Sequence, residues 1–184
     1  MIPIGISEIL KAVDGTLLWG DENGVVTNVV TDSRKAGKGS LFVPIVGERV
    51  DAHQFIPQVM QAGAGVTFSS RKDVAPAASG CCIYVEDTLA ALQKAAAYYR
   101  SRFDIPVIGV TGSVGKTTTK EMISAVLEKK YRVVKTQGNW NSQIGVALMM
   151  FELEPETELA IFEMGMSLPG EMARLVEIAK PQTA

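Results

Sequence analysis

The sequence lacks an excess of positive charge, a signal-peptide pattern in its first residues and a long apolar run, and each absence argues against a class of protein. Its 18 lysine and arginine residues against 20 aspartate and glutamate residues give a net charge of -2 at pH 7, which argues against broad binding to nucleic acid or to an anionic membrane. The first residues have neither the basic start nor the long apolar core of a signal peptide. No apolar run is long enough to cross a bilayer. We therefore expect a cytoplasmic protein with no nucleic-acid partner and no stable membrane insertion.

Cysteine is also scarce. The chain has two, Cys81 and Cys82, and their adjacency disfavours a mutual disulfide and offers no metal-ligand spacing. Because they lie inside an apolar segment, we predict two buried thiols. By contrast, apolar residues make up 47% of the 184-residue chain, which is enough to pack one large or two small domains.

What the chain does have is a glycine-rich turn between an apolar strand and a helix. The apolar run Val-Ile-Gly-Val, within the strand predicted at 105–111, leads into Thr-Gly-Ser-Val-Gly-Lys-Thr-Thr, residues 111–118, here called the phosphate loop. Gly112 and Gly115 can adopt backbone angles that other residues avoid, so successive N–H groups can converge on a phosphate at the positive end of the helix. Lys116 supplies a cation for the β- and γ-phosphates of ATP, and the Thr117 hydroxyl is placed to ligate Mg²⁺. The predicted ATP-binding residues of the loop are Thr111, Gly112, Ser113, Val114, Gly115, Lys116, Thr117 and Thr118.

This loop departs from the commonest nucleotide-binding pattern. The pattern G-x-x-x-x-G-K-[ST] requires glycine at position 110, and this chain has Val110. The loop matches the shorter form T-G-x-x-G-K-T, and its context of strand, turn and helix supports the match. A glycine-rich turn that binds nothing would account for the glycines, but not for the lysine and the run of hydroxyl groups.

The second half of the chain alternates regularly between strands and helices. Strands are predicted at 105–111, 133–134 and 159–164, and helices at 115–130, 144–151 and 170–180. This series predicts a parallel sheet with helices on its faces. The first of these helices is expected to bury an apolar face of Met122, Ile123, Val126 and Leu127, with Lys120, Glu121 and Glu128 largely outside it.

The first part of the chain has shorter elements. Strands are predicted at 25–31, 40–46, 65–68 and 83–85, and helices at 7–13, 54–62 and 88–102. We therefore predict an α/β fold with a small N-terminal α/β substrate domain, residues 1–103, followed by a parallel-sheet P-loop domain, residues 104–184. Because the chain stops where a fourth strand would begin, we expect the P-loop domain to be truncated, with its C-terminal part and a third domain absent.

Polar residues at two further strand ends are candidates for the same site. Glu163 ends an apolar strand, at the edge where open α/β sheets place ligands, and a carboxylate beside a P-loop threonine suits Mg²⁺. The alternative for Glu163 is a solvated acid at a strand end. Asn139 and Asn141 follow the second strand and would orient phosphate, metal-bound water or substrate, although asparagine and glycine also make turns without any ligand.

Two segments of the first domain are candidates for a second phosphate-bearing ligand. Thr-Asp-Ser-Arg at 31–34 closes one strand, and Gly-Glu-Arg-Val-Asp-Ala-His at 47–53 follows the next. The predicted substrate-binding residues are Ser33, Arg34, Asp51 and His53. Both segments would equally form capped loops with surface ion pairs.

Taken together, these motifs resemble the Mur ligase family, the ATP-dependent amide-forming enzymes of peptidoglycan precursor synthesis. The resemblance spans essentially the whole chain, in the order D-S-R, G-x-x-x-D-x-H, G-V-T-G-S-V-G-K-T-T-T-K-E, G-N-x-N, and E-M-G-M followed by G-E. Within the family, the pair Lys120 and Glu121 and the G-N-x-N segment favour the member that adds D-alanyl-D-alanine over the ligase that adds the third amino acid.

The resemblance implies ATP-dependent peptide bond formation. ATP would phosphorylate the terminal carboxylate of UDP-MurNAc-tripeptide, and the amine of D-alanyl-D-alanine would then attack the acyl phosphate. It implies catalytic roles for Lys116 on the β- and γ-phosphates and for Glu163, which with Thr117 would hold Mg²⁺. It places the segments 31–34 and 47–53 against the UDP-sugar. Since a third domain completes such an enzyme, the chain alone is expected to be inactive.

Three other interpretations remain open at this point. One is a related amide ligase, such as the diaminopimelate- or lysine-adding enzyme or a folylpolyglutamate synthase, which would keep the phosphate loop and change the first domain. Another is a P-loop kinase or GTPase-like switch, although the chain has no guanine-reading N-K-x-D motif. The last is a P-loop module that binds a nucleotide without catalysis.

Overall fold

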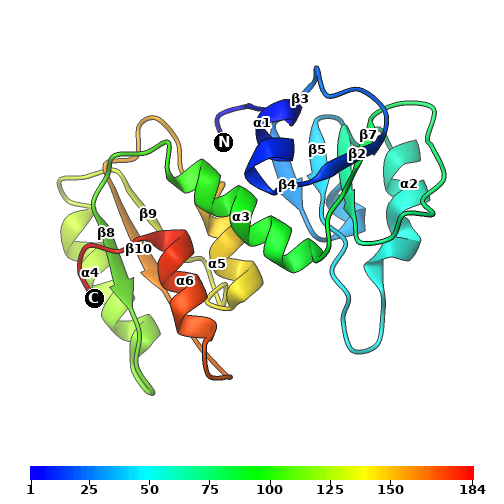
Figure 1. Cartoon of the computed structure of the whole chain (residues 1–184). Helices are drawn as coiled ribbons and strands as arrows, with labels where there is room; N and C mark the ends of the chain where they lie inside the picture. Colours follow the sequence, from blue (N-terminus) through cyan, green and yellow to red (C-terminus); the bar gives the residue numbers. More distant parts are fainter. The chain divides into compact units, whose positions relative to one another are not determined.

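The computed structural model describes all residues from 1 to 184, which form two compact units, Met1–Ala95 and Ala96–Ala184, each with its own sheet (Figure 1). The division falls inside helix α3, Thr88–Arg100. The last turn of α3 explains this position. The hydroxyl of the fully buried Tyr99 donates to the carbonyl of Leu153 at 2.7 Å. Arg100 donates to the carbonyls of Phe103, Ile105 and Ala179.

The first unit is built on a five-stranded sheet of order β2-β7-β6-β5-β4. Its strands are β2 Thr16–Trp19, β4 Asn28–Val30, β5 Ser40–Phe42, β6 Val66–Ser69 and β7 Cys81–Tyr84. The strands from β4 to β7 pair in parallel, and β2 pairs antiparallel with β7. Two further strands, β1 Ile4–Gly5 and β3 Val25–Val26, make a separate antiparallel pair. The α/β prediction is confirmed, but β1 was missed because it has only two residues and β2 because none of its residues is fully buried.

Helices cover this sheet and complete its core. They are α1 Ile6–Ala12, α2 Ile56–Gln61 and the 3-10 turns η1 Ser33–Lys35 and η2 Ala52–Phe55. One core cluster consists of Val30, Phe42, Ile56, Val59, Met60 and Ala64. Cys81 and Cys82 are buried and free, as predicted. Burial raises the pKa of the Cys81 thiol to about 11 and that of Cys82 to about 12, so neither is a reactive thiolate at neutral pH.

The second unit holds a parallel sheet of order β8-β10-β9. Its strands are β8 Val107–Val110, β9 Val133–Lys135 and β10 Leu159–Glu163, and its helices are α4 Lys116–Leu127, α5 Gln143–Met150 and α6 Glu171–Ala179. Figure 1 shows α4 on one side of this sheet and α5 and α6 on the other, as right-handed crossovers require for this strand order. Thr183 makes a parallel bridge to Ile108 on the free edge of β8. None of the helices is both long enough and apolar enough to span a membrane.

Helix α4 buries a different face from the one its apolar residues predicted. Lys120 is 1% exposed, and Ile123 and Leu127 pack against the sheet residues of the second core cluster. Met122 and Val126, expected inside, are 67% and 71% exposed. The prediction was right for Ile123 and Leu127 and wrong for Met122 and Val126, because it counted Lys120 as a surface residue. The spacing of positions 120, 123 and 127 is that of one helix face, and the lysine belongs to it.

Candidate nucleotide site

The phosphate loop connects the end of β8 to the start of α4. Gly115 caps the helix at φ 78°, and Gly112 lies at φ 136°, both in the left-handed region that favours glycine. The loop residues before Lys116 are exposed, so their N–H groups at the helix start are accessible to an anion. The Lys116 ammonium donates to the carbonyl of Gly112 at 2.8 Å and so folds back over the loop. An exposed loop and a lysine at the start of a helix are the features by which a phosphate loop binds an anion.

The structure brings residues from three elements together at the carboxylate of Glu163, the last residue of the central strand β10. The Thr117 hydroxyl at the start of α4 donates to Oε2 of Glu163 at 2.9 Å. The side-chain amide of Asn141, after β9, donates to Oε1 at 2.9 Å. Glu163 is 2% exposed, so the alternative of a solvated acid is wrong. Asn139 is exposed, and no hydrogen bond brings its side chain to this cluster.

Lys120 and Thr136 belong to the same cluster and were not predicted. The Lys120 ammonium donates to the carbonyl of Thr136 at 2.8 Å and lies 3.8 Å from Oε2 of Glu163. The hydroxyl oxygen of Thr136 accepts the backbone N–H of Glu163 at 2.8 Å. The signal for Lys120 was its place on the buried face of α4. Thr136 carried no such signal, because its role depends on a strand distant in sequence.

The oxygen donors of this cluster fit a hard divalent cation. The Thr117 hydroxyl and the Glu163 carboxylate are of the type that Mg²⁺ takes, together with phosphate oxygens and water. The chain has no group of three or more His, Cys, Asp or Glu side chains that could hold a metal ion without other ligands. A cation at Glu163 would therefore need further oxygen ligands, such as water or phosphate oxygens.

The turn that carries Asn141 is packed directly against α5, which yields a prediction. A Cβ on Gly145 would lie 2.6 Å from the Cα of Trp140, and backbone cannot give way as a side chain does. Gly145→Ala is therefore expected to destabilise the protein by about 1–3 kcal/mol, against a helix-propensity gain of only about 1 kcal/mol. Urea unfolding measures the change.

The control is Gly37→Ala, where an added Cβ meets nothing within 4 Å. Its free energy of unfolding is expected to stay within about 0.5 kcal/mol of the wild-type value. Wild-type stability of Gly145→Ala would contradict the packing described.

In the first unit, the segment 31–34 forms a capped turn after β4. Asp32 accepts the backbone N–H of Arg34 at 3.0 Å and two hydrogen bonds from its guanidinium at 2.9 and 2.7 Å. These bonds lower the pKa of Asp32 to about 2, so it is a carboxylate at neutral pH. The Arg34 side chain is largely exposed and retains free N–H groups for an anionic ligand. Ser33 is the first residue of η1.

In the segment 47–53, the buried His53 instead joins a partly exposed network. Nδ1 of His53 lies 2.6 Å from Oδ1 of Asp51, and Nε2 accepts the backbone N–H of Ser70 at 3.0 Å. Arg71 also pairs with Asp51. Burial acts to raise the pKa of Asp51, but the hydrogen bonds from His53 outweigh it and the pKa is lowered. Because both ring nitrogens of His53 are engaged and the side chain is buried, it orders this loop and has no free nitrogen for a ligand. Ser70 and Arg71 were not predicted.

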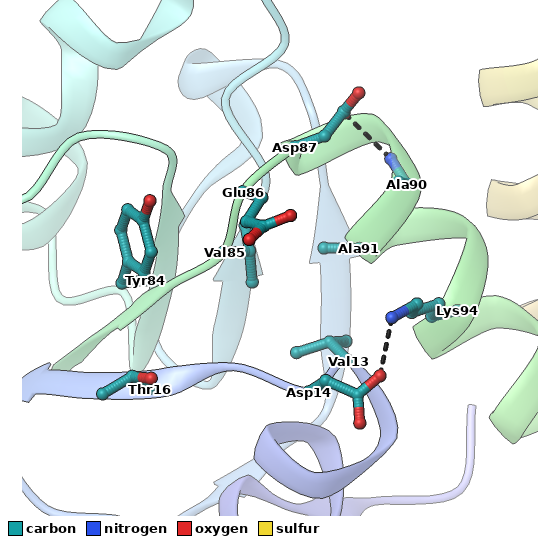
Figure 2. A pocket seen from close by; sticks show the side chains of 10 residues that line it. All are labelled: Val13, Asp14, Thr16, Tyr84, Val85, Glu86, Asp87, Ala90, Ala91 and Lys94. Atoms are coloured by element: carbon teal, nitrogen blue, oxygen red, sulfur yellow. Dashed lines mark hydrogen bonds and ion pairs between the residues drawn. The ribbon is translucent and has the colours of Figure 1, made fainter.

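A cavity of about 380 Å³ lies where β7 ends and α3 begins (Figure 2). Its lining combines apolar side chains, among them Val13 and Ala91, with carboxylates and one lysine. Lys94 pairs with Asp14 at 2.7 Å across the cavity. None of the predicted substrate-binding residues lines it.

A parallel sheet whose first strand leads into a glycine-rich loop, a lysine and a threonine defines a P-loop nucleotide-binding domain. The chain matches the Mur ligase middle domain over residues 110–184 and the catalytic domain of the Mur ligase family over residues 25–100. It belongs to the Mur ligase family.

Similar proteins agree with this assignment. The chain is 44% identical over 185 residues to the UDP-N-acetylmuramoyl-tripeptide--D-alanyl-D-alanine ligase of Bacillus subtilis, covering 100% of the chain and 40% of that protein. It is 36% identical to the Escherichia coli protein of the same name, again over 100% and 40%. The crystal structure of MurF from Acinetobacter baumannii aligns with a TM-score of 0.90 at 34% identity, over 97% of this chain and 39% of that one. MurF ligase from Thermotoga maritima in complex with ADP aligns with a TM-score of 0.76 at 36% identity, over 84% and 35%. The chain thus spans about 40% of the length of the curated relatives it matches.

Proposed function

We propose that the chain provides the ATP-binding and UDP-sugar-binding parts of a ligase that joins D-alanyl-D-alanine to UDP-MurNAc-tripeptide. The observation that carries the proposal is the convergence of Lys116, Thr117, Asn141 and Glu163 around the phosphate loop. The names of the similar proteins supply the substrates. We place the reaction in the bacterial cytoplasm, where ATP and UDP-linked sugars are available.

In the proposed reaction, the terminal carboxylate of UDP-MurNAc-tripeptide attacks the γ-phosphorus of ATP, and ADP leaves. The amine of D-alanyl-D-alanine then attacks the acyl carbon, the new amide forms, and phosphate leaves. The loop N–H groups and Lys116 stabilise negative charge on the transferring phosphoryl group. Thr117 and Glu163 would hold Mg²⁺, which neutralises charge on the phosphate oxygens. Asn141 keeps the Glu163 carboxylate oriented.

The nucleotide part of this proposal is tested on the chain itself. ATP titrated calorimetrically in Mg²⁺ should bind, and GTP should bind more weakly. Preferential binding of GTP would favour the GTPase-like interpretation. A chain that binds ATP but not UDP-MurNAc-tripeptide would support the kinase or the non-catalytic nucleotide module instead.

The substrate part leads to a prediction for Arg34, whose guanidinium is the exposed cation of the segment 31–34. Arg34→Ala is expected to weaken binding of UDP-MurNAc-tripeptide by about tenfold or more, the loss expected for a charge-assisted hydrogen bond. Lys35→Ala is the matched control, because Lys35 is the exposed neighbouring cation. Calorimetric titration measures both. Equal affinities in the two variants would remove Arg34 from the site.

A further inference from the structure

We propose that Lys120 is a positioning residue for the metal-binding end of the nucleotide site. Its buried ammonium braces the ends of β9 and β10, so that the Glu163 carboxylate faces Thr117. This inference rests on the proposed function, because it concerns the carboxylate assigned there to Mg²⁺. Lys120 itself touches neither nucleotide nor metal in this assignment.

The contacts of Lys120 show what it braces. Its ammonium is 2.8 Å from the carbonyl oxygen of Thr136, 3.1 Å from Oε1 of Glu121 and 3.8 Å from Oε2 of Glu163. Its shortest contact is therefore to the backbone where the chain leaves β9. Since the side chain is 1% exposed, water cannot replace these contacts if the ammonium is removed.

Thr136 connects Lys120 to strand β10. Its backbone N–H donates to the carbonyl of Ile161 at 3.0 Å, and its hydroxyl oxygen accepts the N–H of Glu163 at 2.8 Å. One side chain of α4 thus holds Thr136, and Thr136 holds the backbone of Glu163. The same helix also supplies Thr117, which donates to the Glu163 carboxylate. Helix α4 therefore fixes the positions of both oxygens proposed to bind the metal, those of Thr117 and Glu163.

The positive charge of Lys120 has a second effect on metal binding, and this effect opposes that of the brace. It supplies a counter-charge to a carboxylate that is 2% exposed, and a buried carboxylate is costly without one. The same positive charge would also repel a divalent cation at Glu163. If repulsion dominated, removing the ammonium would strengthen metal binding, whereas loss of the brace weakens it. The 2.8 Å contact to Thr136 against 3.8 Å to Glu163 favours the brace.

The test compares ATP affinity in Mg²⁺ and in EDTA, by calorimetry, for the wild-type chain and Lys120→Met. Methionine keeps the length of the side chain and removes its charge. The gain in affinity that Mg²⁺ confers is expected to fall by about tenfold, as for other residues that orient metal ligands, while the affinity in EDTA stays within about twofold. A merely structural role would not change the two conditions differently.

Lys135→Met is the matched control. Lys135 pairs with Glu121 at 2.9 Å and with Glu128 at 3.2 Å, but has no ion pair with Glu163. Its Mg²⁺-dependent gain should equal that of the wild type. An unchanged or larger gain in Lys120→Met would overturn the inference about Lys120. Equal ATP affinity of the wild type in Mg²⁺ and EDTA would overturn the proposed Mg²⁺ site itself, which is a separate result.

The double variant Lys120→Met with Glu163→Gln covers the case in which Lys120→Met does not fold. The double variant removes both charges, so no buried charge is left without its partner. It is therefore expected to unfold at a higher urea concentration than Lys120→Met alone. An equal or lower midpoint would show that the two side chains do not act together, and would overturn the inference.

Discussion

Glu163→Ala is expected to lower the free energy of unfolding by about 3 kcal/mol and to remove the effect of Mg²⁺ on ATP affinity. Glu163 is buried and forms an ion pair with Lys120, which is also buried. Removing one partner of a buried pair leaves the other charge uncompensated, which costs about 3–5 kcal/mol. We expect the lower end because Glu121 remains beside Lys120 at 3.1 Å.

Glu163→Gln separates stability from metal binding. The amide preserves the volume of the side chain and an oxygen for the Asn141 hydrogen bond, so the loss of stability should be smaller than for alanine. Loss of the charge should still abolish the Mg²⁺ effect. This expectation differs from the one for an acid exposed at a strand end, whose removal would leave stability nearly unchanged.

Urea unfolding and calorimetric ATP titration measure both effects. Glu177→Ala is a suitable control, since Glu177 is an exposed acid on α6 and its removal should change stability by less than about 0.5 kcal/mol. If Glu163→Ala unfolded like this control, the ion pair with Lys120 would have no energetic role.

The phosphate loop could be predicted from sequence because its information is local. Gly112 and Gly115, with Lys116 and Thr117, occur within a few residues of one another, and each has a specific stereochemical reason to be there. Glu163 could also be placed near the loop, because the carboxyl ends of parallel strands share one edge of a sheet. Its burial could not, since burial depends on what α4 and the turn after β9 place over it.

The error in the buried face of α4 has a physical cause, which is that apolar periodicity does not detect a buried charge. Lys120 was taken for a surface residue because lysine usually is one, and the predicted buried face of α4 shifted toward Met122 and Val126. His53 stays a predicted substrate-binding residue, and the structure adds that its ring nitrogens lie against Asp51 and Ser70. The contact between His53 and Ser70 joins positions 17 residues apart, so no local pattern records it.

Lys116→Ala is expected to weaken ATP binding by at least tenfold in the presence of Mg²⁺. The Lys116 ammonium is poised over the phosphate loop through its bond to the Gly112 carbonyl, and a bound phosphate would replace that carbonyl as its partner. A charge-assisted hydrogen bond contributes about 1.5–3 kcal/mol, and about 1.4 kcal/mol corresponds to tenfold in affinity. Stability should hardly change, because Lys116 makes an exposed contact that water can replace.

The control for Lys116→Ala is Lys129→Ala, which removes an exposed lysine just beyond the opposite end of α4. Both variants have the same net charge, so a nonspecific electrostatic effect on ATP would appear equally in both. A loss confined to Lys116→Ala would locate the phosphates at the loop. If the two variants bound ATP with the same affinity in calorimetric titrations, the phosphate loop would not be the nucleotide site, and the assignments of Thr117 and Glu163 to Mg²⁺ would lose their basis.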